Sequence, residues 1–474
     1  MSDLHELTAT EQLTAMRTGE VSSADLTRHY LERIDRLDAE LGAFVTVCPE
    51  VALAEAARAD ERRAAGDDAP LLGLPLGIKD LHPTAGVRTT FGSAALADVV
   101  PSEDSWTVGL LRQAGGVLVG KTNAPELGPT CYTHNDVTDQ PAVTPYDTRR
   151  YASGSSGGAA TAVAAGLLPV GHASDGAGSI RTPAATCHLV GVKPSRGLVS
   201  AAPLSSLIST GIEGPIARTV ADAALLLDVM AHPAPGDLYG WQPPTSFTRA
   251  LDQRPGPLRV AVWTDTGVPG SEPHPESLAA VQRATALLRE LGHQVEEIAI
   301  PAGYEEPTRT AVVNWFVTAI GASVPQVIPA DRTDLLRPYT RHLVERCAEV
   351  SGREAVASQA VLARYASTFL SALHDYDIAL TPTTNGPPVP VGHYFADGVE
   401  GEADRMLTWS CYTPWVNLTG QPAVSLPSHL DADGLPHAVQ LVGRRQHDTD
   451  LLALAAHLEA AGLWEPLHPT CWRS

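Results

Sequence analysis

Stretches with a helical pattern and short extended apolar stretches alternate along most of this 474-residue chain. In 23–37 the apolar residues recur at the spacing of one helix face, and extended apolar runs follow at 74–78 and 117–119. The alternation resumes at 258 and ends in a last helical stretch over 448–461. This pattern predicts an α/β/α layered fold, with a central mixed, mostly parallel sheet flanked by helices.

The chain shows no internal repeat, long linker or low-complexity tract. Two clusters of Pro and Gly, at 232–240 and 386–392, are short enough to be surface loops. Length alone would allow two or three domains. Because nothing marks a boundary, we predict one domain spanning residues 1–474.

The charge balance excludes some classes of partner. Asp and Glu number 54 against 33 Lys and Arg, a net charge of −21, which repels phosphate backbones and anionic lipid. The apolar run 159–170 is too short to span a bilayer. Six widely spaced cysteines without a CxxC pair, and a start at Met1 without a basic and apolar leader, indicate reduced thiols. We therefore expect a cytoplasmic protein that binds neither nucleic acid nor membrane.

Lysine is rare in this chain. Of its 33 basic residues only Lys79, Lys121 and Lys193 are lysine, and all three lie near the Gly/Ser-rich segments. Arginine cannot give up its proton, whereas a desolvated lysine can become a neutral base. Lys79 ends an apolar strand candidate, where it can be buried, so it is the candidate base. For Lys121 and Lys193 we predict packing or hydrogen-bonding roles.

The Gly/Ser-rich segment 153–158 allows several interpretations. A flexible linker is disfavoured because a helix-forming Ala run follows at once. A phosphate loop is disfavoured because neither a Walker pattern nor GxGxxG is present. Residues 154–158 do fit GxSxG, the nucleophile elbow, with Ser156 as nucleophile and an acid and a histidine such as His374 or His437 downstream.

A different interpretation uses a second small-residue cluster. Gly176, Ala177 and Gly178 directly precede Ser179, and their backbone N–H groups could converge on a developing oxyanion. A serine hydroxyl needs a neighbouring base to become a nucleophile. Lys79 could be that base, with the 155–156 serine pair between the two.

Three blocks, at 77–80, 154–158 and 175–184, resemble the amidase signature family in residues, order and separation. The similarity continues through 191–195, 214–218 and 418–423, so it covers nearly the whole chain, with a signature core at about 70–220. It implies the amidase signature fold and a cofactor-independent amidohydrolase without a metal. The substrate would be a small-molecule amide, cleaved to an acid and an amine or ammonia, and the protein could be a homodimer.

The resemblance also implies roles for individual residues. The family's Ser–cisSer–Lys triad falls on Ser179 as nucleophile, Ser155 as the relay held by a cis peptide bond, and Lys79 as base. Residues implied to form the oxyanion hole or to support the loop are Gly176, Ala177 and Gly178 (with the amide of Ser179), and Ser156, Asp175 and Arg181.

Substrate choice is expected to rest on residues outside the signature, in 125–140 and 300–420. The aromatic candidates, which could equally belong to the core, are Tyr132, Trp315, Trp409 and Trp415. The sequence at 174–176 and 193–197 is similar to that of bacterial amidases acting on linear or cyclic aminohexanoate-type amides.

Three alternatives share the same signature: a glutamine-hydrolysing subunit of a tRNA-dependent amidotransferase, a non-catalytic binding protein, and an acyltransferase or esterase.

The chain departs from the family at Ala177, where glycine is usual, and at His188, where glycine is common. We predict a packed, structural role for His188. The run 131–134 pairs a Cys with a His but has no second pair at ligand spacing, so we expect no metal there.

Overall fold

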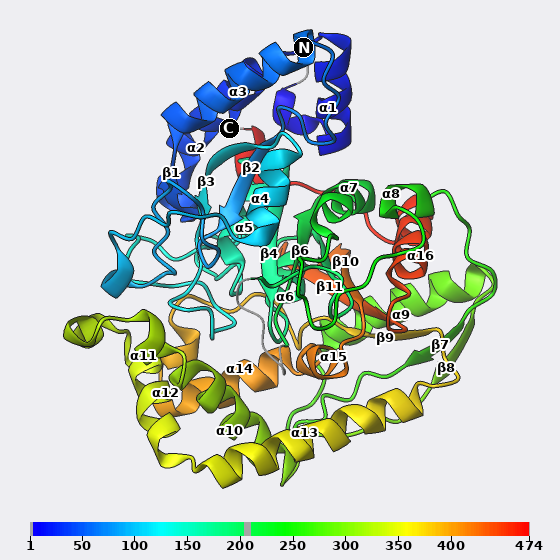
Figure 1. Cartoon of the computed structure of the whole chain (residues 1–474). Coiled ribbons are helices and arrows are strands. Elements are labelled where there is room, and N and C mark those ends of the chain that lie inside the picture. The colour runs from blue at the N-terminus through cyan, green and yellow to red at the C-terminus, as the bar shows by residue number, and fades with distance from the viewer. Residues whose placement is uncertain (1–2, 203–209, 474) are drawn as a thin grey trace.

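An 11-stranded sheet runs through the computed structural model, which describes residues 3–202 and 210–473. Met1 and Ser2, which carry part of the localisation prediction, lie outside the described residues. The strands lie side by side in the order β1-β3-β2-β4-β6-β5-β10-β11-β9-β7-β8 (Figure 1). Their bounds are β1 Phe44–Val47, β2 Pro75–Lys79, β3 Val117–Thr122, β4 Val170–Asp175, β5 Val190–Lys193, β6 Ile212–Ala217, β7 Arg259–Val262, β8 Gln294–Glu297, β9 Ile378–Pro382, β10 Ala423–Leu430 and β11 Pro436–Gly443.

The sheet is mixed, as predicted, but the expectation that it is mostly parallel is wrong. Pairing is parallel only within β3-β2-β4 and β9-β7-β8. The remaining neighbours pair antiparallel. Alternation of strands and helices fails to predict direction here because β10 and β11 form a hairpin, β6 pairs antiparallel with both β4 and β5, and β5 pairs with β10 far away in the sequence.

Helices cover both faces and both ends of the sheet (Figure 1). The N-terminal helices lie near β1 and β3 at the top of the view, and α10 to α13 lie along the bottom, while the two chain ends lie close together. The helices are α1 Ala9–Thr18, α2 Ser23–Leu41, α3 Pro49–Ala64, α4 Trp106–Gln113, α5 Gly157–Ala164, α6 Arg181–Thr186, α7 Val220–Met230, α8 Phe247–Ala250, α9 Pro275–Glu290, α10 Thr308–Gly321, α11 Val324–Val327, α12 Pro338–Glu349, α13 Gly352–Ala372, α14 Glu402–Ser410, α15 Pro414–Thr419 and α16 Asp448–Ala460.

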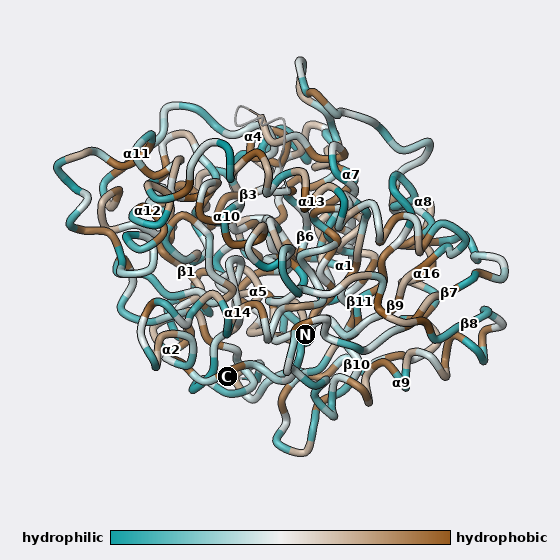
Figure 2. The backbone as a smooth tube through the Cα atoms, turned by 90° about the horizontal axis from the view of Figure 1, so that it is seen from below, coloured by the Kyte–Doolittle hydropathy of each residue, from teal (hydrophilic) through white to brown (hydrophobic). Residues whose placement is uncertain are grey.

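The depth of burial differs between the centre and the edge of the molecule. Every residue of β2, β3 and β5 is buried, as expected for strands covered on both faces. In α9, by contrast, apolar and polar turns alternate (Figure 2), and only one face, with Ala280, Ala284 and Leu288, is buried. The central strands therefore provide a dry, rigid support for any side chain at their ends.

Candidate active site

Lys79 owes its position to two parallel strands. It is the last residue of β2, which pairs in parallel with β4, and β4 ends at Ser174 and Asp175. Parallel neighbours end at the same edge of a sheet, the edge where α/β folds place their ligands. The Lys79 amine consequently lies 3.0 Å from Oγ and 3.1 Å from the carbonyl oxygen of Ser174.

The Lys79 amine also contacts the first serine of the Gly/Ser-rich segment. Its Nζ lies 2.8 Å from Oγ of Ser155, and both side chains are buried. Burial lowers the pKa of Lys79 to about 7, against the opposing attraction of Asp175 and Glu213. A substantial fraction of this lysine is therefore neutral near pH 7 and able to accept a proton.

The loops that carry Ser155 and Ser179 contact each other. The Gly154–Ser155 peptide bond is cis, as the family resemblance implied. Thr182 Oγ1 donates to the carbonyl of Gly154 (3.2 Å) and accepts from Ser153 Oγ (3.1 Å). Ser179, three residues before Thr182, is half-buried and lines the same cavity as Gly154.

The glycines of these loops serve close packing. A Cβ on Gly158 would overlap the backbone of Asn123, and one on Gly178, whose φ is 134°, would overlap the side chain of Thr413. The segment is thus folded tightly against its surroundings, which excludes the flexible-linker interpretation.

A buried ion pair holds the loop that carries Ser179. Arg181 donates to both carboxylate oxygens of Asp175 (2.9 and 3.0 Å), and Asn417 Nδ2 donates to Asp175 Oδ1 (2.9 Å). Burial alone would raise the pKa of Asp175, but the guanidinium and these hydrogen bonds hold it well below its usual range. Asp175 is therefore an ionised brace, fixed from α6 and α15.

The same brace corrects one predicted role. The backbone N–H of Gly178 donates to Oδ1 of Asp175 (2.6 Å), so it cannot also serve the oxyanion hole. Within residues 3–202 and 210–473, the N–H groups of Gly176, Ala177 and Ser179 have no hydrogen-bond partner. All three residues line the cavity, so these amides are the available donors.

Ser156 does not have the environment of a nucleophile. It is fully buried before α5, its Oγ donates to the carbonyl of Ser174 (3.2 Å), and it accepts from the Ser174 N–H (3.3 Å). Within the described residues neither suggested histidine has a hydrogen bond to Ser156: His437 bonds to Asp431 (3.0 Å), and His374 is exposed. The nucleophile-elbow interpretation is therefore wrong, and Ser156 braces the end of β4.

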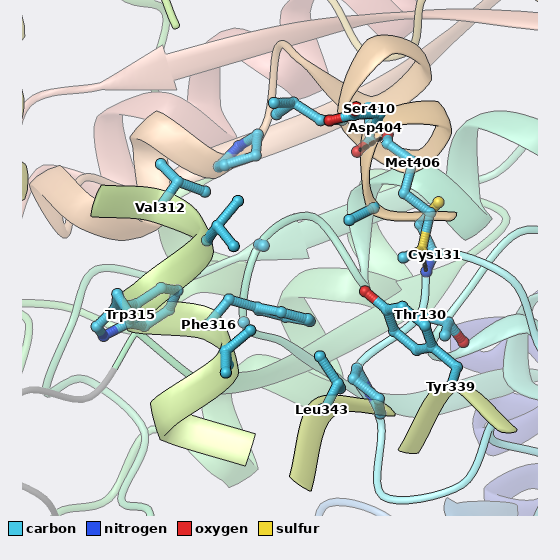
Figure 3. Close-up of a pocket in the computed structure, with 18 of the residues that line it drawn as sticks. Thr130, Cys131, Val312, Trp315, Phe316, Tyr339, Leu343, Asp404, Met406 and Ser410 are labelled. Atoms are coloured by element: carbon cyan, nitrogen blue, oxygen red, sulfur yellow. Dashed lines mark hydrogen bonds between the residues drawn. The ribbon is translucent and has the colours of Figure 1, made fainter. Parts of the chain in front are cut away.

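A cavity of about 650 Å³ opens in front of Ser179. Its walls come from the 129–131 loop, α10, α12 and α14, and Figure 3 shows Phe316 projecting into the space between α10 and that loop. Apolar side chains dominate, among them Val312, Trp315, Leu343 and Met406. Thr308–Val327, which comprises α10 and α11, is by length and composition the one described stretch apolar enough to cross a membrane, and here α10 forms a cavity wall.

Three of the four aromatic candidates for the pocket are core residues. Trp315 lines the cavity, as predicted. Tyr132 stacks with Tyr394, Trp409 donates from Nε1 to the Pro387 carbonyl, and Trp415 stacks on Phe369, and none of the three lines the cavity. The wall on α12 falls within the predicted range 300–420, but Tyr339 and Leu343 were not singled out, because that helix carries an ordinary amphipathic pattern.

The mouth of the cavity carries excess negative charge. Arg309 pairs with Asp404 (2.6 Å) and Arg346 with Glu349 (2.9 Å). The other two carboxylates of the lining, Glu345 and Glu400, are exposed and have no ion pair with any residue that the structure describes.

Comparison with known proteins decides the family. The Amidase family model matches residues 25–452. The chain belongs to the amidase family. It is 38% identical to the putative amidase AmiA2 of Mycobacterium tuberculosis over 98% of this chain and 95% of the relative. Among solved structures it resembles 6-aminohexanoate cyclic dimer hydrolase complexed with substrate (TM-score 0.91, 30% identity, covering 99% and 100%) and a bacterial aryl acylamidase of the amidase signature family (0.87, 28%, 98% and 98%). The protein is thus an amide-hydrolysing enzyme with the amidase signature fold.

In this amidase His188 has a structural role, as predicted. Its φ is 55°, in the left-handed region that favours glycine, which explains why glycine is common there. Its Nε2 lies 2.9 Å from the carbonyl of Glu465, its ring packs against Tyr146, and it does not line the cavity.

The other two lysines are also buried. Lys121 donates to the hydroxyls of Thr84 (2.7 Å) and Thr89 (3.0 Å), and Lys193 donates to the carbonyl of Pro194 (2.8 Å). Burial lowers the pKa of Lys121 to about 8 and that of Lys193 to about 7. Unlike Lys79, neither lysine has a hydrogen bond to Ser155 or Ser179 within the described residues, in agreement with the predicted structural roles.

We expect Asp175→Asn to destabilise this amidase strongly. The change leaves the Arg181 guanidinium buried without a counter-charge, at a cost of about 3–5 kcal/mol. The melting temperature from circular dichroism should fall by several degrees. As a control, Asp397→Asn removes an exposed pair with Arg405 and should change it little, and equal effects of the two variants would contradict the brace.

Proposed function

We propose that this amidase hydrolyses carboxylic amides through an acyl-enzyme on Ser179, with Ser155 as proton relay and Lys79 as base. The observation that carries the proposal is the 2.8 Å contact between the buried Lys79 amine and Ser155 Oγ, one peptide bond from a cavity wall shared with Ser179.

The hydrogen-bond partners of Lys79 fit either charge state, and its lowered pKa favours the neutral amine in the resting enzyme. Its Nζ has three oxygen neighbours, the Oγ of Ser155 and the carbonyl and Oγ of Ser174. An ammonium would donate to all three oxygens, whereas a neutral amine has two N–H groups for Ser174 and one lone pair. That lone pair is then left to accept the proton of the Ser155 hydroxyl.

The reaction follows from this arrangement. Ser179 Oγ attacks the amide carbonyl carbon while its proton passes to Ser155 and the Ser155 proton passes to Lys79. Negative charge builds on the carbonyl oxygen, where the free N–H groups of Gly176, Ala177 and Ser179 can stabilise it. The C–N bond then breaks as the relay returns the proton to the leaving nitrogen, and water releases the acid by the same route.

The cavity favours uncharged substrates with an apolar acyl or aryl part. Its walls are mainly apolar, and the unpaired Glu345 and Glu400 at its mouth oppose a substrate carboxylate. Among the residues that the structure describes, both arginines of the cavity lining are paired with carboxylates, so neither arginine is free to bind the α-carboxylate of glutamine. The titles of the similar structures, a cyclic amide hydrolase and an aryl acylamidase, support the same class. We therefore prefer a linear or cyclic neutral amide over glutamine.

The nucleophile can be tested by two serine variants. Ser179→Ala should lose activity by a factor on the order of 10⁴ and form no acyl-enzyme, because the attacking oxygen is gone. Ser156→Ala should still be acylated, because Ser156 only braces β4. Intact-protein mass spectrometry after reaction with a fluorophosphonate reports this directly, and labelling that depends on Ser156 alone would refute the assignment.

The base can be tested by pH dependence. Because only neutral Lys79 can accept a proton, kcat/KM should be low in acid and rise about tenfold per pH unit to a plateau above about pH 7. Lys79→Arg keeps the positive charge but cannot lose it, so it should be nearly inactive at every pH. Full activity of Lys79→Arg would exclude Lys79 as the base.

Substrate charge can be tested with matched amides. We expect kcat/KM for hexanamide to exceed that for the monoamide of adipic acid by roughly tenfold. The carboxylate of the monoamide is repelled by Glu345 and Glu400, and each repulsion within a Debye length costs about 1 kcal/mol or less. The double variant Glu345→Gln/Glu400→Gln should narrow that ratio. Faster hydrolysis of L-glutamine than of hexanamide would instead favour the amidotransferase subunit. Transfer to hydroxylamine measures acyltransferase activity.

A further inference from the structure

A second group of buried titratable side chains adjoins Lys79 through its backbone. His172 on β4 and Glu213 on β6 lie on the same face of the sheet, because Glu213 pairs with Ser174, two residues beyond His172. His172 Nε2 lies 2.7 Å from Glu213 Oε2, and its Nδ1 accepts from the Lys79 backbone N–H (3.4 Å). His82, just after β2, lies 3.4 Å from the other oxygen of Glu213.

These three side chains have the composition of a metal site, and within the described residues they form the one such group with converging ligand atoms. The hydrogen bonds favour another role. Because Nδ1 of His172 accepts from the Lys79 N–H, the ring carries its proton on Nε2 and donates it to Glu213. Both nitrogens of His172 are then engaged, and neither offers a lone pair to a cation.

The pair carries charge close to Lys79. Burial lowers the pKa of His172 to about 4, so the ring is neutral at pH 7. Burial would raise the pKa of Glu213, but His82 and His172 hold it well below its usual range, so the carboxylate is ionised. Of the two carboxylates that favour the charged form of Lys79, Asp175 is matched by Arg181. Neutralising Glu213 should therefore lower the pKa of Lys79 without also leaving the Arg181 guanidinium unpaired.

Most of the elements around Lys79 carry titratable groups. The residues of α5 carry none. Those on the strands, the loop after β2, α6 and α2 are Asp80, His82, Lys121, His172, Asp175, Arg181, Glu213, Tyr30 and Arg33. Asp80 and Lys121 are each hydrogen-bonded to threonine hydroxyls, and Arg33 donates to the Ala165 and Gly166 carbonyls.

We propose that Glu213 and His172 are positioning residues for Lys79: Glu213 fixes the tautomer of His172, His172 holds the Lys79 backbone amide, and the Glu213 charge raises the pH at which the Lys79 amine becomes free to accept a proton. This inference rests on the proposed function, in which Lys79 is the base. The two residues act through Lys79 and touch neither substrate nor the cavity.

The test separates charge from shape. Glu213→Gln keeps an oxygen acceptor for His172 but removes the charge that stabilises the lysine ammonium. The acidic limb of kcat/KM should therefore move to lower pH by roughly half to one unit. One unit below the wild-type midpoint, this variant should retain about three to five times more of its plateau rate than the wild type. Glu213→Asp keeps the charge but has a shorter side chain that reaches His172 less well. It should therefore lower the plateau value of kcat/KM and leave the acidic limb of the pH profile at the wild-type pH.

A matched control is Glu126→Gln, which neutralises another buried carboxylate, one that accepts from Ser93 Oγ (2.7 Å) and the Arg337 N–H (2.9 Å). The acidic limb of its kcat/KM profile should stay at the wild-type pH.

An unmoved limb in Glu213→Gln, or an equal shift in Glu126→Gln, overturns the proposal. Stoichiometric metal in the purified wild type that is lost in Glu213→Gln also overturns it. If Glu213→Gln does not fold, a limb that moves in Glu213→Asp overturns it as well. A wild type with no acidic limb near neutrality contradicts the Lys79 base itself, and so the proposed function.

Discussion

The burial of one amine organises this active site. Removing the Lys79 side chain from water disfavours its charged form, and Ser155 and Ser174 surround the amine with three oxygens. That environment requires strands covered on both faces, and β2 and β3 are buried throughout. The lowered pKa of Lys79 thus follows from its place at the end of a strand that is buried throughout.

The two halves of the sheet contribute differently. The parallel set β3-β2-β4 brings Lys79 and Ser174 to one edge. The antiparallel set, together with α15, brings distant residues to the loop that follows β4. Asn417 contacts Asp175, and Gln440 accepts from Arg181 (2.6 Å), more than 230 residues along the chain. Breaking the chain into two domains would separate Asp175 from these partners, which is a physical reason for one continuous sheet.

In the proposed mechanism, the reacting groups and the cavity wall lie in different parts of the chain. The proposed reacting groups sit on strand ends and tight loops before residue 182, whereas most of the apolar wall comes from α10, α12 and α14. The wall can therefore change its shape and charge while the reacting groups keep their contacts. The resemblance to a cyclic amide hydrolase and an aryl acylamidase, enzymes named for different substrates, fits this separation.

The sequence by itself determined the family, the candidate triad and the layered fold, because those depend on local blocks and on the alternation of helices and strands. It also singled out Lys79, since lysine is so rare in this chain. Only the tertiary structure decided the direction of the strands, the engagement of the Gly178 amide by Asp175, and the placement of Tyr132, Trp409 and Trp415 in the core. The His172–Glu213 pair was likewise invisible, because its members meet across two strands. Each of these features depends on contacts between segments far apart in the chain, and an aromatic residue carries the same local pattern whether it faces a cavity or the core.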